Sequence, residues 1–150
     1  MSPDARFVYR LEAAQDSGPV QIVVLLYEQL IADLRGALSA LEQQNTEQRT
    51  SDISHALEIV AHLQGRLDME RGGDVARNLD RFYDLLRKGI IDAQFRQSAE
   101  ILQMQIKNLV FLREAWVEVA RAVSNGDTAT PAPSVSESPA PDKPAADWSA

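Results

Sequence analysis

The sequence predicts an all-α fold: an antiparallel up-and-down four-helix bundle with a short N-terminal segment and a disordered C-terminal tail. Three observations lead to this prediction. Apolar residues recur every three or four positions over most of the chain as far as Val123, which is the spacing of one helix face. The breaks between these periodic stretches are short, so consecutive helices should run antiparallel. No stretch shows the alternating pattern of a strand.

Four apolar stripes define the expected helices. The first begins at Pro19, whose missing N–H is not needed in a first helical turn, and Ser17 or Gly18 is placed to cap it. A polar stretch at 43–52, the two glycines at 72–73 and a weak break at 95–98 separate the stripes. In chain order the stripes are Val20, Val24, Tyr27, Ile31, Leu34, Leu38 and Leu41; Ile53, Leu57, Val60, Leu63 and Leu67; Val75, Leu79, Phe82, Leu86, Ile90 and Ala93; and Leu102, Ile106, Leu109, Leu112, Trp116, Val119 and Val123.

The two adjacent glycines predict a sharp corner between the second and third helices. A glycine just past a helix end often takes the left-handed conformation that closes the helix. We therefore expect left-handed backbone at Gly72 or Gly73, with Asp74 capping the helix that follows.

Composition excludes several classes of function. The chain of 150 residues has no cysteine, which rules out disulfides, thiolate metal sites and cysteine nucleophiles. Its 15 Lys and Arg against 22 Asp and Glu give a net charge of -7, which disfavours nucleic acid and anionic lipid as partners. The start of the chain lacks the pattern of a secretory signal, and no apolar run is long enough for membrane insertion. We expect a cytoplasmic protein.

The last part of the chain differs in composition from the rest. Five of the seven prolines lie between Pro131 and Pro144, among Ala and Ser, with few apolar residues to offset the entropy of ordering the backbone. The predicted domain division is a helical bundle at 1–123 and a disordered tail at 124–150.

Three motifs, in order along the chain, resemble the FliS family, the cytoplasmic chaperones of flagellin in flagellar type III export. LDMERGGDVARNLDRFYDLL is similar to the hairpin of that family, GPVQIVVLLYEQLIADL to its opening helix, and LVFLREAWVEV to its closing segment. Gly18 and Met69 depart mildly from the family pattern, which usually has Ser and Phe there. The resemblance covers about residues 7 to 123, through Pro19, Leu26, Tyr27, Glu28, Leu67, Asp68, Glu70, Gly72, Gly73, Val75, Ala76, Asn78, Leu79, Tyr83, Leu112, Arg113, Ala115 and Trp116.

The resemblance implies a function and a partner. The chain would be a cytoplasmic export chaperone that binds the C-terminal helical segment of flagellin, prevents its premature polymerisation and supports its delivery to the flagellar type III export apparatus. It would be no enzyme and would need no cofactor. An export-gate component is a further partner that the sequence leaves open, as it leaves open the oligomeric state of the free protein.

Apolar residues outside the four stripes are the candidates for client binding, because a helical client packs by burying apolar side chains. A charged residue at Ile22, Leu25 or Ile59 is expected to weaken client binding while leaving the fold. The same change at Leu79 or Leu109 is expected to unfold the bundle. Tyr27 and Tyr83 are expected at the edge of the core with their hydroxyls bonded, and Tyr9 on a segment that covers the groove until a client displaces it. The full candidate set is Tyr9, Ile22, Leu25, Leu26, Tyr27, Ile59, Tyr83, Ile101, Met104 and Phe111.

Two other classes of function remain open from the residues alone. His55, Glu58 and His62 lie on nearby faces of one helix, but no Glu-x-x-His or His-Glu-x-x-His motif accompanies them, so solvated side chains are the simpler interpretation. A structural or adaptor bundle that pairs with itself through the same apolar residues would share every feature of the fold.

Overall fold

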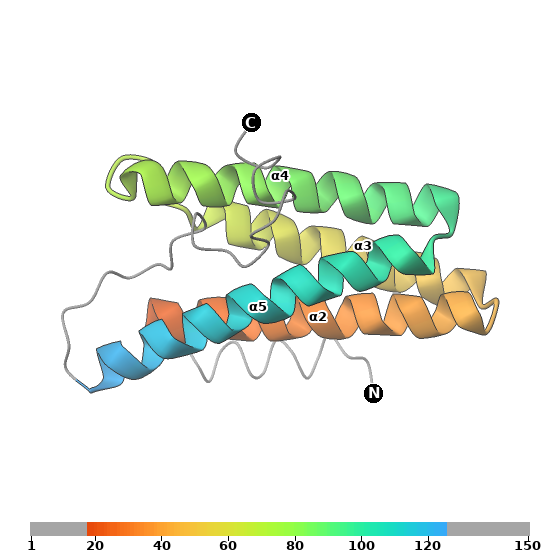
Figure 1. Ribbon diagram of the computed structural model, residues 1–150, viewed down its shortest axis with the longest axis horizontal. Helices are drawn as coiled ribbons and strands as arrows, with labels where there is room; N and C mark the ends of the chain where they lie inside the picture. Colours follow the sequence, from red (N-terminus) through yellow and green to blue (C-terminus); the bar gives the residue numbers. More distant parts are fainter. Residues whose placement is uncertain (1–17, 126–150) are drawn as a thin grey trace.

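The computed structural model describes residues 18–125, which form four helices and no strand. The helices are α2 (Pro19–Glu42), α3 (Thr46–Gly65), α4 (Gly73–Arg96) and α5 (Ala99–Ser124). Figure 1 shows that each helix runs antiparallel to the next one along the chain. The predicted all-α up-and-down bundle is therefore confirmed for this part of the chain. The N-terminal segment with Tyr9, and the predicted tail beyond Asn125, lie outside the described residues.

The helices form a ring in which α2 and α4 occupy opposite corners. Both of them pack against α3 and α5. The core lies along the centre of the ring and is built from all four helices, as the stripes predict. Its fully or almost fully buried side chains include Tyr27, Leu30, Leu34, Ala56, Val60, Leu63, Leu79, Phe82, Leu86, Ile90, Leu102, Leu109 and Leu112.

Some members of the predicted stripes lie at the margin of the core. Val123 is 46% exposed on the last turn of α5, so its assignment to the core is wrong. Leu67 lies beyond the end of α3, although it still packs against the core from the corner that follows. The other marginal members are only partly buried: Leu38, Leu41, Leu57, Val75, Ile106 and Val119.

The helix starts follow local capping chemistry. Pro19 occupies the first turn of α2 as predicted, and Gly18 precedes it as the N-cap with a φ of 104°. The polar stretch at 43–52 is mostly helix, because Asn45 Oδ1 accepts a hydrogen bond of 3.1 Å from the Gln48 N–H and starts α3 at Thr46. The predicted break there was too long.

The break between α4 and α5 is also shorter than the sequence predicted. Phe95 and Arg96 belong to α4, and the chain turns at Gln97, whose φ of 50° is left-handed. Ser98 then caps α5 by accepting a hydrogen bond of 3.1 Å from the Ile101 N–H. The tight turn keeps the side chain of Phe95 on the helical surface of α4.

The corner between α3 and α4 is wider than the sequence predicted. Helix α3 ends at Gly65, so the glycine pair does not close it. Asp68 organises the corner, since its Oδ1 accepts hydrogen bonds from the N–H groups of Glu70 (3.1 Å) and Arg71 (2.9 Å). Asp68 O accepts a further bond of 2.7 Å from the Gly72 N–H.

The two glycines have different roles at the start of α4. Gly73 has the predicted left-handed backbone, with a φ of 55°, but as the first residue of α4. Gly72 is the N-cap in right-handed conformation, and a Cβ there would lie 2.7 Å from Asp68 O. The prediction that Asp74 caps α4 is wrong, because Asp74 lies inside the first turn. Glycine is required at position 72 because Asp68 O lies close to it, and at position 73 because the backbone has a positive φ.

Replacing Gly73 by valine is expected to lower the free energy of unfolding by about 1 to 2 kcal/mol, because a β-branched residue is strained at positive φ. The space around Gly73 is open, so the loss would come from the backbone alone. Gly73→Asn is the matched control, since asparagine tolerates this conformation better. Urea unfolding followed by circular dichroism measures both variants, and equal losses would contradict the assignment.

Candidate partner-binding surface

The structure places half of the predicted client-binding residues inside the core. Tyr9 lies outside the described residues. Leu25, Ile101 and Phe111 are half-buried, and Met104 is 55% exposed. The buried members, none more than 8% exposed, are Ile22, Leu26, Tyr27, Ile59 and Tyr83.

The expectation that Ile22, Leu26 and Ile59 lie outside the core is wrong. Each helix of the ring contacts two neighbours, so its buried face is wider than a single stripe. Ile59 is only 1% exposed, and Leu26 only 2%. A charge at Ile22 or Ile59 is therefore expected to destabilise the fold, because it would be buried.

Tyr27 and Tyr83 bond to each other across the diagonal of the bundle. Their hydroxyl oxygens lie 2.8 Å apart, which joins α2 to α4 through the core. Burial raises the pKa of Tyr27 to about 12 and raises that of Tyr83 well above its usual value. Both hydroxyls are neutral at pH 7, and the pair acts as a structural link.

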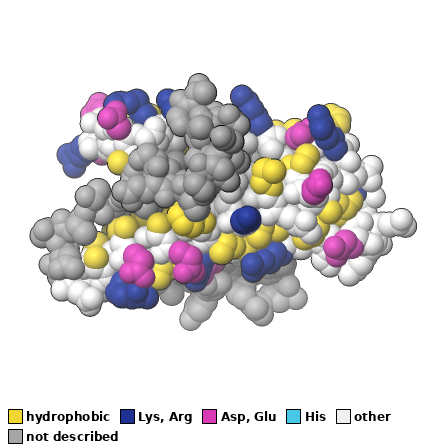
Figure 2. Space-filling model, viewed as in Figure 1, with side chains coloured by type: hydrophobic (Ala, Val, Ile, Leu, Met, Phe, Trp, Pro, Cys, Tyr) yellow, Lys and Arg dark blue, Asp and Glu magenta, His cyan; other side chains and the backbone are white. Residues whose placement is uncertain are grey.

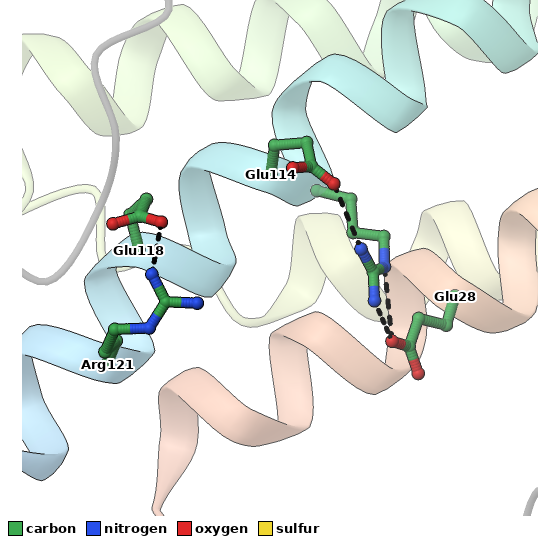
Figure 3. Close-up of polar contacts among 5 residues, drawn as sticks. Glu28, Glu114, Glu118 and Arg121 are labelled. Atoms are coloured by element: carbon green, nitrogen blue, oxygen red, sulfur yellow. Dashed lines mark hydrogen bonds and ion pairs between the residues drawn. The ribbon is translucent and has the colours of Figure 1, made fainter.

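The three sequence motifs meet around this pair. Tyr27 of the first motif packs against Tyr83 of the second and Trp116 of the third, at ring centroid distances of 6.4 and 6.3 Å. Beside them, Arg113 on α5 reaches Glu28 on α2, with its NH2 group 2.5 Å from Glu28 Oε2 (Figure 3). The motif residues thus hold the helices in place.

The remaining candidates on α5 share one side of that helix. A Cβ at Gly89 of α4 would lie against the Gln105 amide, so Gln105 marks the flank of α5 that faces α4. Ile101, four residues before Gln105, lies next to this flank, and Met104 and Phe111, which are seven residues apart, share a line along α5 further round on the same side. Figure 2 shows hydrophobic side chains along the seam between α4 and α5, bordered by charged ones. We call Ile101, Met104 and Phe111 the α5 face.

Leu25 does not join the α5 face. Its neighbours one turn away on α2 are Gln21 and Glu28. Glu28 bonds Arg113, and Gln21 lines a shallow groove of about 290 Å³ with Val24, Val117, Ala120 and Arg121. Arg121 also pairs with Glu118, as Figure 3 shows. Leu25 therefore flanks the opposite side of α5.

A second apolar groove is not predicted by the four stripes. It lies between α3 and α4, has a volume of about 420 Å³, and is lined by Ile53, Leu57, Ile91 and Phe95 with Thr50 and Gln94. Phe95 is 85% exposed. In the predicted pattern Phe95 falls in a helix break and Ile91 belongs to no stripe. The signal that could have found them is their four-residue spacing, continued from Arg87 along α4.

The histidine on the inner side of α3 is not a solvated one. His55 Nδ1 lies 2.6 Å from Asp33 Oδ2 on α2, and Gln29 donates a hydrogen bond of 2.9 Å to Asp33 Oδ1. Burial raises the pKa of Asp33, while these two hydrogen bonds act against that shift. Glu58 and His62 are exposed and take no part in this cluster.

Neither a metal cluster nor a membrane helix is found in the part of the chain that the structure describes. Among residues 18–125, no three His, Asp or Glu side chains are grouped closely enough to hold a metal ion. None of the described helices has the length and apolar character needed to cross a membrane.

Comparison of the sequence with known proteins places the chain in a family. The family model described as "Flagellar protein FliS" matches residues 2–123. A Vibrio cholerae protein named flagellar secretion chaperone FliS is 30% identical over 103 residues, which cover 69% of this chain and 76% of that protein. A Salmonella typhimurium protein of the same name is 27% identical over 113 residues, covering 75% and 84%. The flagellar secretion chaperone FliSB of Pseudomonas aeruginosa is 28% identical over 101 residues, covering 67% and 80%.

Proposed function

Because the chain belongs to the FliS family of flagellar proteins, we propose that it is a flagellar secretion chaperone whose client is flagellin. The relatives are named as secretion chaperones, a class that works by binding and carries out no catalysis. The finer proposal is that the chain binds the C-terminal helical segment of flagellin in the cytoplasm. It would thereby prevent premature polymerisation and support delivery to the flagellar type III export apparatus.

The observation that carries the finer proposal is the α5 face. Ile101 and Phe111 pack on the core while remaining partly accessible, and Met104 is more exposed than buried. A helical client segment could cover this side of α5 with apolar residues at three- and four-residue spacing. Methionine suits such a surface, because its flexible thioether adapts to irregular partners.

The proposed client has an apolar side that needs to be covered before assembly. An amphipathic helix that packs inside a filament exposes its apolar side before assembly. Burying that side against the α5 face would keep the client soluble. The charged residues that border the face would then affect the rate of association with the client more than the affinity. An export-gate component would be a further partner of the loaded chaperone.

Calorimetric titration of the full-length chain with flagellin tests the proposal. We expect one-to-one binding to full-length flagellin, with only a modest effect of salt because apolar burial dominates. Flagellin that lacks its C-terminal segment should not bind. Equal binding to both forms, or binding to neither, would contradict the proposed function.

A further inference from the structure

A buried carboxyl group and a histidine meet where α3 packs against α2. His55 Nδ1 on α3 lies 2.6 Å from Asp33 Oδ2 on α2. The side chain of Asp33 is only 6% exposed, whereas that of His55 is 19% exposed. Solvent therefore reaches this pair through the histidine, and a proton can enter or leave the pair without unfolding of the bundle.

Hydrogen bonds hold the carboxyl group of Asp33 in one orientation. Gln29, one turn earlier on α2, donates from its Nε2 to Asp33 Oδ1 at 2.9 Å. Each carboxyl oxygen therefore has a partner. The amide of Gln29 carries no charge at any pH. A change in the protonation of the pair therefore acts mainly on the contact between Asp33 and His55.

His55 is the cationic partner of Asp33, since no Lys or Arg in the described part of the chain forms an ion pair with that carboxyl group. The other charged group that acts on Asp33 is Asp52, an anion three residues before His55 on α3. Asp52 Oδ1 accepts a hydrogen bond of 3.1 Å from Gln48 Nε2, and its Oδ2 lies 2.7 Å from where a Cβ on Gly36 of α2 would stand. Asp52 thus faces α2 and opposes a negative charge on Asp33.

The neighbouring turns add no compensating charge to the pair. On α3, the other acid one turn from His55 is Glu58, which is exposed. Among the described residues, neither α4 nor α5 contributes a charged group that acts on Asp33. The positions one turn from Asp33 on α2 hold uncharged residues, which are Gln29, Leu30, Gly36 and Ala37.

The protonation states of the pair differ in the net charge that they enclose between the helices. With one proton on the pair, Asp33 and His55 are neutral overall, whichever of the two carries it. Loss of that proton leaves an enclosed carboxylate beside Asp52, with a neutral imidazole as its partner. Because burial of a net charge is unfavourable, the folded bundle holds this proton more tightly than the unfolded chain does.

The sign of the effect on stability follows from this difference. Burial raises the pKa of Asp33 and Asp52 acts in the same direction, although the hydrogen bonds from Gln29 and His55 oppose the shift. A proton that is held more tightly in the folded state stabilises the fold while it is bound. That contribution is lost as the pH rises and the proton leaves.

We propose that Asp33 and His55 form a proton-dependent latch between α2 and α3, which holds these helices together more strongly in mildly acidic than in mildly alkaline solution. Histidine is the residue type whose charge changes between about pH 5 and pH 8, so the latch acts in that range. The latch lies between α2 and α3, whereas the α5 face lies beside α4. It can therefore be tested without flagellin.

Urea unfolding of the full-length chain and of Asp33→Asn, at several values between about pH 5 and pH 8, tests the latch. Asparagine has nearly the same shape and still bonds both neighbours, but it has no carboxyl group to titrate. We expect the folding equilibrium constant of the unmodified chain, divided by that of D33N, to fall at least about threefold over this range. The ratio removes the contribution of titrating groups that the two chains share. A ratio that is constant, or that rises with pH, would overturn the proposal.

His62→Gln is the matched control, because His62 is the other of the two histidines in the chain and is exposed on the same helix. This variant should keep the pH dependence of the unmodified chain, and a loss of that dependence would contradict the assignment to His55.

A titration followed by nuclear magnetic resonance tests whether Asp33 and His55 share the proton. The carboxyl carbon of Asp33 and the imidazole carbons of His55 should change together, as the signals of coupled groups do. In D33N the transition of His55 should move to lower pH, because the carboxylate that favours the imidazolium is gone, and the transition of His62 should stay in place. An unmoved transition of His55 in D33N would show that the two residues do not act as a latch.

Discussion

Replacing Ile59 with aspartate is expected to unfold the bundle. Ile59 is 1% exposed in the core, so the substitution buries a carboxylate without a partner and removes apolar packing. The combined cost should be at least about 4 kcal/mol, which is a large part of the roughly 5 to 15 kcal/mol that stabilises an ordinary domain. Urea unfolding followed by far-ultraviolet circular dichroism measures the loss.

Ile91→Asp is the matched control for this experiment. It makes the same chemical change on a side chain that is 41% exposed, so the cost should stay below about 1 kcal/mol. If both variants were equally stable, Ile59 would have to be accessible, and the core derived from the structure would be wrong at that position.

Loss of flagellin binding with retention of the fold is the expected result for Met104→Asp. Met104 is 55% exposed, so the bundle should keep its helical signal and its unfolding midpoint. A charge placed on the α5 face would have to be buried against an apolar client helix, which should weaken binding at least about tenfold. Adding Phe111→Ala should bring the loss to roughly 100-fold, because a second anchor is removed.

Met69→Asp serves as the matched control for client binding. Met69 has nearly the same exposure, 45%, but lies in the corner before α4 and away from the α5 face. Calorimetric titration with full-length flagellin should give the same affinity for this variant as for the unmodified chain. Equal losses at Met69 and Met104 would mean that the α5 face is not the specific client surface.

The aromatic cluster shows that residues which identify a family need not be the residues that bind its partner. The motif residues Tyr27, Tyr83 and Trp116 carried the resemblance to the FliS family, and the family match agrees with it. In the structure Tyr27 and Tyr83 are 0% and 1% exposed and bond to each other. A motif can identify a family because it maintains the fold, and its residues then lie away from the surface that binds partners.

The sequence by itself determined the number and order of the described helices, their antiparallel course and most of the core. Helical periodicity is a local property, and it is sufficient to orient residues such as Leu79 and Leu109 inward. The left-handed glycine at the α3–α4 corner was also predictable, because few residues other than glycine take that conformation.

Only the tertiary structure decided which of the remaining apolar residues are accessible. Ile59 and Ile101 both lie outside the predicted stripes, yet Ile59 is buried where α3 meets its neighbours and Ile101 is partly accessible on α5. The groove beside Phe95 likewise depends on the register of α3 against α4, which the bond between Gln94 and Thr50 fixes. The physical reason is that exposure depends on the direction from which neighbouring helices approach, and a periodic pattern in one helix does not contain that direction.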